Sequence, residues 1–265
     1  MAEKERLDVA MQARGIAPSR SHAQALIMAG QVLVNGQQAQ KASQTVRAAD
    51  VVSIKEKLRY VSRGGLKLEK ALRVFPIDVS GKRCLDVGAS TGGFTDCLLQ
   101  NGAQKVYAVD VGHGQLDYAL RNDARVVCME RCNARNLTVD QIEAPVDFAC
   151  ADVSFISLRL ILPPMRDCLS PQGEMIVLIK PQFEAGREQI GKGGVVRDAR
   201  VRRQICLERL HDAVSIGLYP YGLDVSPITG PKGNVEFLLW LKKQPGGIAD
   251  AQFEALCDQV CFQTP

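Results

Sequence analysis

The sequence predicts an α/β protein in which a small α+β module precedes a doubly wound parallel sheet with helices on both faces. After residue 59, short and nearly continuous apolar segments alternate with helical ones, as in βα units whose strands are buried on both sides. The first sixty residues instead show two short helical segments followed by small strands. A polar stretch at residues 55–59 separates the two patterns, so we expect domains at residues 1–58 and 59–265.

Size and composition indicate a globular protein with a substantial core, since the chain has 265 residues of which 46% are hydrophobic. No apolar run approaches the roughly 18–20 residues of a membrane helix, and the first fifteen residues lack a signal-peptide core. We therefore expect a cytoplasmic protein without stable membrane association. Nine scattered cysteines, most in apolar segments, favour free, packed thiols over a disulfide framework or a metal site.

Positive charge is concentrated in two places. Residues 1–60 hold nine Lys and Arg against five Asp and Glu, and residues 180–209 hold eight against four. Such clustering suggests contact with an anionic polymer. The run Arg197, Arg200, Arg202 and Arg203 is compatible with RNA phosphates along a helix and equally with a solvated helix face.

The first module begins with two short helices. One has its apolar face within residues 7–11, and the second begins at Ser19 or Ser21 as N-cap and ends at Gly30. Strands are expected at residues 31–34 and 50–54, with an Asn35-Gly36 hairpin turn after the first.

The segment RLDVAMQARGIAPSRSHAQALIMAGQVLVNGQ in this module resembles the S4 RNA-binding domain. The resemblance implies that Arg6, Ser19, Arg20 and Ser21 face RNA phosphates, through guanidinium groups and the amides of a helix start.

The larger domain continues the alternation. Strands are expected at residues 83–88, 105–112, 124–131, 146–153, 174–181 and 234–243, and helices at 93–102, 114–123 and 195–217. In an open parallel sheet, ligands bind beyond the carboxyl ends of the strands. The loop DVGASTGGFT, at residues 86–95, has a sharp glycine turn without the G-x-G-x-x-G spacing of a pyrophosphate loop. Asp110 ends the next strand and is the acid expected to hold a ribose diol.

This D-x-G-x-x-x-G-G-F loop resembles motif I of class I methyltransferases that use S-adenosylmethionine. The resemblance implies a Rossmann-like domain with a mostly parallel, seven-stranded sheet, Asp86 near the cofactor amine, and either Asn133 or Ala134 beside the adenine. The residues that we expect to contact the cofactor are Asp86, Gly88, Ser90, Gly92, Gly93, Phe94, Asp110, Val111, Asn133 and Ala134.

Charged residues stand where two further strands end. Asp152 closes one and Lys180 the next, while Lys67 and Glu236 lie in glycine-containing segments. A lysine with its ordinary pKa near 10.4 is a poor base at neutral pH. Burial and a second ammonium lower that pKa, whereas carboxylates raise it, so two lysines and two acids could aim one deprotonated amine at a sugar hydroxyl.

The order Lys67, Asp152, Lys180, Glu236 resembles the K-D-K-E tetrad of FtsJ-type RNA ribose 2′-O-methyltransferases. With SRGGLKLEKAL, VDVGHGQLDYALR, ADVSFISL, LIKPQFEAGRE and SPITGPKGNVEFL, residues 3–243 resemble the TlyA family. The resemblance implies methylation of a cytidine 2′-hydroxyl in 16S or 23S ribosomal RNA, or in both. Ribosomal RNA or a ribosomal subunit would be the partner, with the S4 domain and Arg63 on the RNA. Lys180 would be the general base, Asp152 would orient it, and the other two would place the ribose.

Two alternatives stay open at this point. The chain could be a non-catalytic RNA-binding assembly factor, or a membrane-lytic haemolysin, a name that the family also carries. The lytic hypothesis lacks a spanning or strongly amphipathic segment in the sequence. Residues 251–265 predict an amphipathic helix packed on the sheet.

Overall fold

The computed structural model describes residues 4–55 and 59–263. The chain divides into two compact units, Met1–Leu58 and Arg59–Pro265. Residues 56–58 of the expected linker lie outside the described residues.

The N-terminal unit packs two helices against short strands. Ser19 is the N-cap of the second helix, because its hydroxyl accepts the amide of His22 at 3.2 Å. The Asn35-Gly36 turn lies between two paired antiparallel strands, as predicted, and both residues have positive φ. The elements are β1 (Lys4–Arg6), α1 (Leu7–Ala13), α2 (Arg20–Met28), β2 (Val32–Val34), β3 (Gln37–Gln38), β4 (Thr45–Arg47) and β5 (Val52–Ile54), in sheets ordered β1-β4 and β3-β2-β5.

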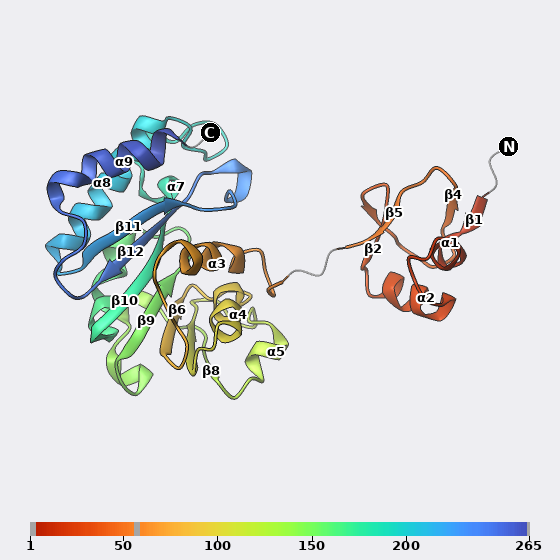
Figure 1. Cartoon of the computed structure of the whole chain (residues 1–265), viewed down its shortest axis with the longest axis horizontal. Helices are drawn as coiled ribbons and strands as arrows, with labels where there is room; N and C mark the ends of the chain where they lie inside the picture. Colours follow the sequence, from red (N-terminus) through yellow and green to blue (C-terminus); the bar gives the residue numbers. More distant parts are fainter. Residues whose placement is uncertain (1–3, 56–58, 264–265) are drawn as a thin grey trace. The chain divides into compact units, whose positions relative to one another are not determined.

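The C-terminal unit contains a seven-stranded sheet in the order β11-β12-β10-β9-β6-β7-β8 (Figure 1). The strands from β8 to β10 pair in parallel, and β12 pairs antiparallel with both of its neighbours. This confirms the prediction of a mostly parallel, seven-stranded sheet. The strands are β6 (Arg83–Val87), β7 (Lys105–Val109), β8 (Val126–Met129), β9 (Val146–Ala151), β10 (Leu169–Ile179), β11 (Tyr219–Val225) and β12 (Phe237–Lys242).

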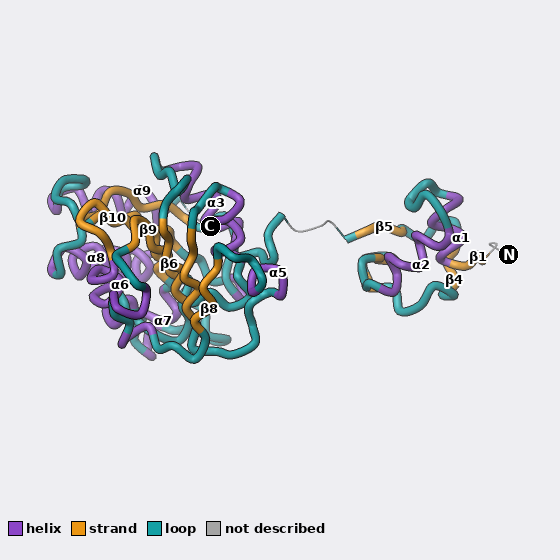
Figure 2. The backbone as a smooth tube through the Cα atoms, turned by 90° about the horizontal axis from the view of Figure 1, so that it is seen from below, coloured by secondary structure: helices purple, strands orange, loops and turns teal. Residues whose placement is uncertain are grey.

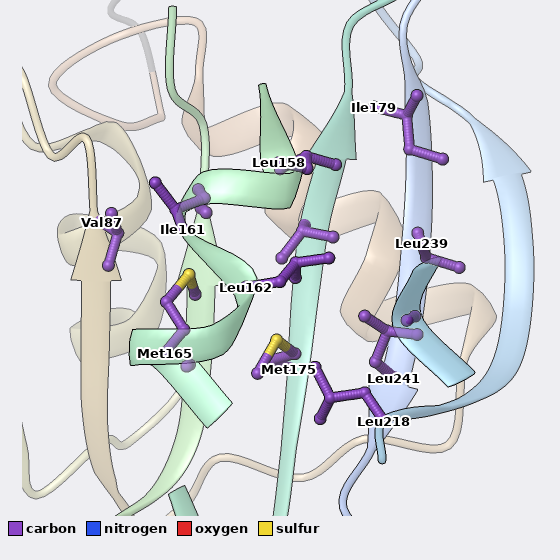
Figure 3. Packing of buried hydrophobic residues seen from close by; sticks show 14 of the residues in the cluster. Val87, Leu158, Ile161, Leu162, Met165, Met175, Ile179, Leu218, Leu239 and Leu241 are labelled. Atoms are coloured by element: carbon purple, nitrogen blue, oxygen red, sulfur yellow. The ribbon is translucent and has the colours of Figure 1, made fainter. Parts of the chain in front are cut away.

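Helices cover both faces of this sheet (Figure 2). Side chains of α6, α8 and α9 form one core cluster with the sheet, and those of α3 and α4 form the other. Figure 3 shows the first cluster, in which Met165 and Met175 pack among aliphatic side chains. The helices are α3 (Gly65–Val74), α4 (Gly93–Gln100), α5 (Tyr118–Arg121), α6 (Leu162–Cys168), α7 (Pro181–Glu184), α8 (Ala199–Ser215) and α9 (Phe253–Phe262). Short 3-10 turns lie at Ala134–Asn136, Val139–Ile142, Leu158–Leu160, Arg187–Gln189, Pro231–Gly233 and Asp250–Gln252.

The sequence prediction omitted β1, β4, β11, α3, α6 and α7, and one predicted helix is much shorter in the structure. The helix expected at 114–123 shrinks to α5, because Glu130 holds the preceding loop by accepting the amide of Gly114 at 2.8 Å. The strand β11 was not predicted, and Pro220 lies within it. Proline has no amide hydrogen to donate. It is tolerated in β11 because this is an edge strand, and the amides on its outer side have no neighbouring strand to bond.

The remaining features of the fold concern the cysteines, the C-terminal helix, and the questions of membrane-spanning helices and metal sites. All nine cysteines are free thiols and seven are buried, which confirms the prediction of packed thiols. The C-terminal helix α9 packs on α8 and β11. Within the described part of the chain, no helix is both long and apolar enough to cross a bilayer. No three His, Cys, Asp or Glu side chains of residues 4–55 and 59–263 are grouped to hold a metal ion.

Candidate active site

The carboxyl ends of β6, β7, β9 and β10 lie at one edge of the sheet, because parallel strands all end on the same side. Asp152 directly follows β9 and Lys180 directly follows β10. Glu236 precedes β12, which runs antiparallel and therefore begins at that edge. Lys67 reaches the same place from the first turn of α3.

The structure brings all four of these side chains into one ion-paired network. The Lys67 ammonium lies 2.9 Å from Asp152 Oδ2 and 2.7 Å from Glu236 Oε2. The Lys180 nitrogen lies 2.5 Å from Asp152 Oδ1. Asp152 thus links the two lysines, and Lys67 links the two acids.

The network is shielded from solvent and held from outside. Lys67 and Lys180 are each 7% exposed, and Glu236 is 1% exposed. Lys180 Nζ also donates to the Ser154 hydroxyl at 3.2 Å, and Gln182 Nε2 donates to Glu236 Oε1 at 3.3 Å. Partial burial makes each of these electrostatic contacts stronger than it would be in water.

The two bridging groups are held in their charged forms. Burial would raise the pKa of Asp152, but Lys180 and Lys67 outweigh it and lower that pKa below its usual value. Burial would lower the pKa of Lys67, but Asp152 and Glu236 outweigh it and raise that pKa. Lys67 is therefore an ammonium at neutral pH. Lys180 contacts one carboxylate, whereas Lys67 contacts two.

A cavity of about 550 Å³ opens onto the tetrad. It carries cations at its rim, including Arg63 and Lys232, and its floor is the network itself. Its lining residues are Ser62, Arg63, Gly64, Lys67, Gly88, Ala89, Ser90, Thr91, Gly93, Phe94, Asp152, Ser154, Lys180, Ile228, Thr229, Gly230, Lys232 and Glu236; we call it the tetrad cavity.

A second cavity of about 530 Å³ lies beside the first, and we call it the Asp110 cavity. Asp110 accepts the backbone amides of Ser90 at 2.8 Å and Gly112 at 2.7 Å, which fixes its carboxylate at the end of β7. The lining residues are Val87, Gly88, Ser90, Val109, Asp110, Val111, Gln115, Cys132, Asn133, Ala134, Arg135, Asp152, Val153, Ser154, Phe155, Ile156 and Ile161, most of them apolar.

The two cavities share Gly88, Ser90, Asp152 and Ser154. Gly88 has φ +82°, and a Cβ atom there would lie 2.9 Å from the Asp152 carbonyl oxygen. A glycine is therefore required for the loops after β6 and β9 to approach this closely. Asp152 stands at the junction of the two spaces.

The structure distributes the predicted cofactor residues unequally. Six of the ten line the Asp110 cavity, whereas Gly93 and Phe94 line only the tetrad cavity. Among the described residues, Asp86 and Gly92 are absent from both linings. Asp86 is fully buried and accepts the Thr95 hydroxyl at 2.7 Å, and burial raises its pKa to about 7. The six in the Asp110 cavity are Gly88, Ser90, Asp110, Val111, Asn133 and Ala134.

In the N-terminal unit, Asp8 organises the expected RNA-facing residues. Its buried carboxylate accepts two bonds from Arg6, each 3.0 Å long, and one from Arg20 at 2.9 Å. Pairing with Arg6, Arg20 and Gln24 holds the pKa of Asp8 well below its usual range. The hydroxyls of Ser19 and Ser21 lie 3.0 Å apart nearby on α2. Asp8 was missed, although it directly follows Arg6-Leu7 in the matched motif.

Two further features of the site were also missed. Phe155 is 89% exposed, has φ +62° and lines the Asp110 cavity, with its ring centroid 4.9 Å from that of Phe183. Glu184, at the end of α7, accepts the Ser157 hydroxyl at 2.7 Å and the Leu158 amide at 2.8 Å. It thereby ties the loop after β9 to the turn after Lys180. The signal available in the sequence for Phe155 was an aromatic residue just after the strand predicted at residues 146–153.

The predicted basic run divides into two kinds of environment. Arg197 and Arg200 are exposed, whereas Arg202 is buried. Arg203 pairs with Glu254 and Asp258 and therefore links α8 to α9.

Comparison with known proteins agrees with this arrangement. The family model described as FtsJ-like methyltransferase matches residues 60–243, and the S4 domain model matches residues 5–52. A Mycobacterium tuberculosis protein named 16S/23S rRNA (cytidine-2′-O)-methyltransferase TlyA is 46% identical, covering 97% of this chain and 99% of its own length. A Brachyspira hyodysenteriae protein named Hemolysin A is 44% identical, covering 88% and 98%. A solved Streptococcus thermophilus structure, whose name provisionally calls it a hemolysin, matches with TM-score 0.75 and 45% identity, covering 99% and 97%.

Proposed function

This chain belongs to the FtsJ-like methyltransferase family, and on that premise we propose that it methylates the ribose 2′-hydroxyl of a cytidine in ribosomal RNA, with S-adenosylmethionine as donor. The observation that carries the proposal is the single network of Lys67, Asp152, Lys180 and Glu236, which lines the tetrad cavity and reaches the Asp110 cavity through Asp152. Support for ribosomal RNA comes from the S4 domain match and from the name of the Mycobacterium tuberculosis relative.

The Asp110 cavity suits the cofactor. Its volume of about 530 Å³ lies within the range of ordinary ligand pockets. The Asp110 carboxylate, fixed by two amides, can accept hydrogen bonds from a ribose diol, and apolar walls that include Val111 and Ile156 suit a flat base. When bound, the cofactor supplies a methyl group already activated on a sulfonium.

In the tetrad cavity, Lys180 is the general base of the proposed reaction. Its neutral amine would take the proton of the ribose 2′-hydroxyl and become an ammonium next to Asp152, which stabilises the new charge. Lys67 keeps its proton and holds Asp152 and Glu236 in place. The protein thus moves one proton and orients one hydroxyl.

The two alternatives receive no support from these observations. A protein that only binds RNA does not require a buried network of two lysines and two acids, which costs desolvation energy to assemble. The name Hemolysin A belongs to a relative, and nothing in the described site suggests membrane lysis. A cytoplasmic location stays a prediction.

The test is ribose methylation of ribosomal subunits purified from cells that lack the protein, mapped by mass spectrometry. The Lys180→Ala variant should bind S-adenosylmethionine normally but methylate at least about 100-fold more slowly, since general base catalysis contributes roughly 10²–10⁴-fold. Lys105→Ala is the matched control, because Lys105 is the first residue of β7 and so lies at the opposite edge of the sheet. A Lys180→Ala rate equal to the wild-type rate would exclude Lys180 as the base.

A further inference from the structure

A third cavity, of about 420 Å³, adjoins the tetrad cavity on the side of α3. We call it the Arg73 cavity. The two share Ile228, Thr229 and Glu236, so the segment that contains Ile228 and Thr229 forms a common wall. The lining of the Arg73 cavity consists of Lys70, Arg73, Val225, Ser226, Pro227, Ile228, Thr229, Val235 and Glu236.

The charge of this cavity is positive. Glu236 is the one acid in its lining, and its carboxylate is already paired with Lys67 at 2.7 Å. Lys70 is fixed at the cavity by Asp224 Oδ2 at 2.9 Å and by the Val225 carbonyl at 2.6 Å. Arg73 is exposed, and no ion pair joins it to any residue of 4–55 or 59–263. Its guanidinium is therefore available to an anion.

Three cations follow one another along α3. Lys67, Lys70 and Arg73 are spaced three residues apart, so each is a neighbour of the next on the helix surface. Lys67 contributes to the tetrad cavity and Arg73 to the neighbouring one, about 9 Å further along the axis. The wall between them is ordered, since Ser226 donates its amide to the Glu236 carbonyl at 2.8 Å and its hydroxyl to the Ile228 carbonyl at 2.7 Å.

We propose that the Arg73 cavity is a subsite for the RNA strand, in which Arg73 binds the phosphate of a nucleotide adjoining the methylated one. The proposal rests on the proposed function, because it takes the target ribose to lie in the tetrad cavity. A strand with its ribose at Lys180 passes over Ile228 and Thr229 into a space that combines a free guanidinium, a fixed ammonium and hydroxyl groups. Arginine and hydroxyl groups are typical phosphate and sugar contacts.

Backbone contacts of this kind have a diagnostic salt dependence. Each phosphate contact to a single strand contributes about 0.7 to the slope of log affinity against log salt concentration. The test is to measure the Michaelis constant for ribosomal subunits at several salt concentrations, with subunits from cells that lack the protein. Arg73→Gln should raise this constant about fivefold at moderate salt and reduce the slope by about 0.7. Arg73→Lys, which keeps the charge, should retain the wild-type slope.

Arg125→Gln is the matched control, because Arg125 immediately precedes β8 at the opposite edge of the sheet. Its salt slope should equal that of the wild type. The turnover number at saturating subunits and the affinity for S-adenosylmethionine should be unchanged in Arg73→Gln. An unchanged slope, or a loss of turnover or cofactor affinity in Arg73→Gln, would overturn the subsite. If the wild type methylates nothing, the proposed function fails, and the same titration of equilibrium subunit binding still decides the subsite.

Discussion

The buried ion pair between Glu184 and Arg209 supports the active-site loop, and its two partners are not equivalent. Their side chains are 2% and 3% exposed. Arg209 also contacts Asp212 at 2.7 Å and Glu208 at 3.4 Å, both of which reach solvent. Glu184 has Arg209 as its cation and otherwise accepts two neutral donors, from Ser157 and Leu158. If Glu184 is removed, Arg209 keeps two carboxylate partners, whereas if Arg209 is removed, Glu184 keeps no cation.

Arg209→Met strands a carboxylate that is almost fully buried. Breaking a buried pair in this way costs about 3–5 kcal/mol of unfolding free energy. Glu184→Gln leaves Arg209 with two carboxylates, and the new amide oxygen can still accept from Ser157 or Leu158. The loss is then one charge-assisted interaction, about 1–2 kcal/mol. The structure therefore predicts that Arg209→Met is the more damaging change, by roughly 2 kcal/mol.

Urea unfolding measured through tryptophan fluorescence tests this order. Trp240 is the one tryptophan in the chain and is buried in β12, so it reports on the C-terminal unit alone. With a slope near 2 kcal/mol per molar urea, the two midpoints should differ by about 1 M.

The double variant Glu184→Met/Arg209→Met provides the control for coupling. Replacing both charges by apolar side chains of similar length should recover most of the loss seen in Arg209→Met, because no buried charge is left unpaired. Equal midpoints for the two single variants would refute the asymmetry. A double variant as damaging as the sum of Arg209→Met and Glu184→Met, each measured alone, would show that the pair is not coupled.

Two other changes separate structural from binding roles among the predicted cofactor residues. The pKa of Asp86 is raised to about 7, so between pH 4 and 7 the folded state binds more protons than the unfolded state, and stability falls as pH rises. Asp86→Asn should remove up to about 4 kcal/mol of this pH dependence of the unfolding free energy. The urea midpoint of the variant should therefore rise relative to that of the wild type from pH 5 to pH 8. Midpoints that change in parallel with pH in the two proteins would contradict this prediction. Asp110→Asn should weaken S-adenosylmethionine binding about tenfold or more in calorimetry, because a diol loses a charged acceptor, while the Michaelis constant for ribosomal subunits stays constant; equal cofactor affinity would remove Asp110 from the site.

The part of the site that lies at strand ends could be predicted from the sequence. Asp110, Asp152 and Lys180 each follow a recognisable apolar strand, and parallel strands end at one edge, so their convergence follows from topology. Lys67 lies on a helix and Glu236 precedes an antiparallel strand. The sequence pattern around Lys67 and Glu236 does not predict that they lie at that edge of the sheet. Their place in the tetrad was implied by the resemblance to FtsJ-type enzymes.

Residues that act through tertiary contacts were beyond sequence reasoning. Asp8 pairs with Arg20, twelve positions further along the chain, and Glu184 joins the loop after β9 to α8. Neither role has a periodic or spacing signature in the chain. The position of Asp86 shows the converse case, since its place in a motif suggested the cofactor amine, whereas its side chain is bonded to Thr95 and buried.

The shared carboxylate of Asp152 explains why this arrangement needs two lysines. A single buried lysine beside Asp152 would form a simple ion pair, and its amine would stay protonated because losing the proton would strand the acid. With Lys67 also bound to Asp152 at 2.9 Å, the acid keeps a cation when Lys180 gives up its proton. Glu236 in turn compensates the charge of Lys67. In the proposed reaction, the neutral form of Lys180 thus leaves one ammonium and two carboxylates still joined.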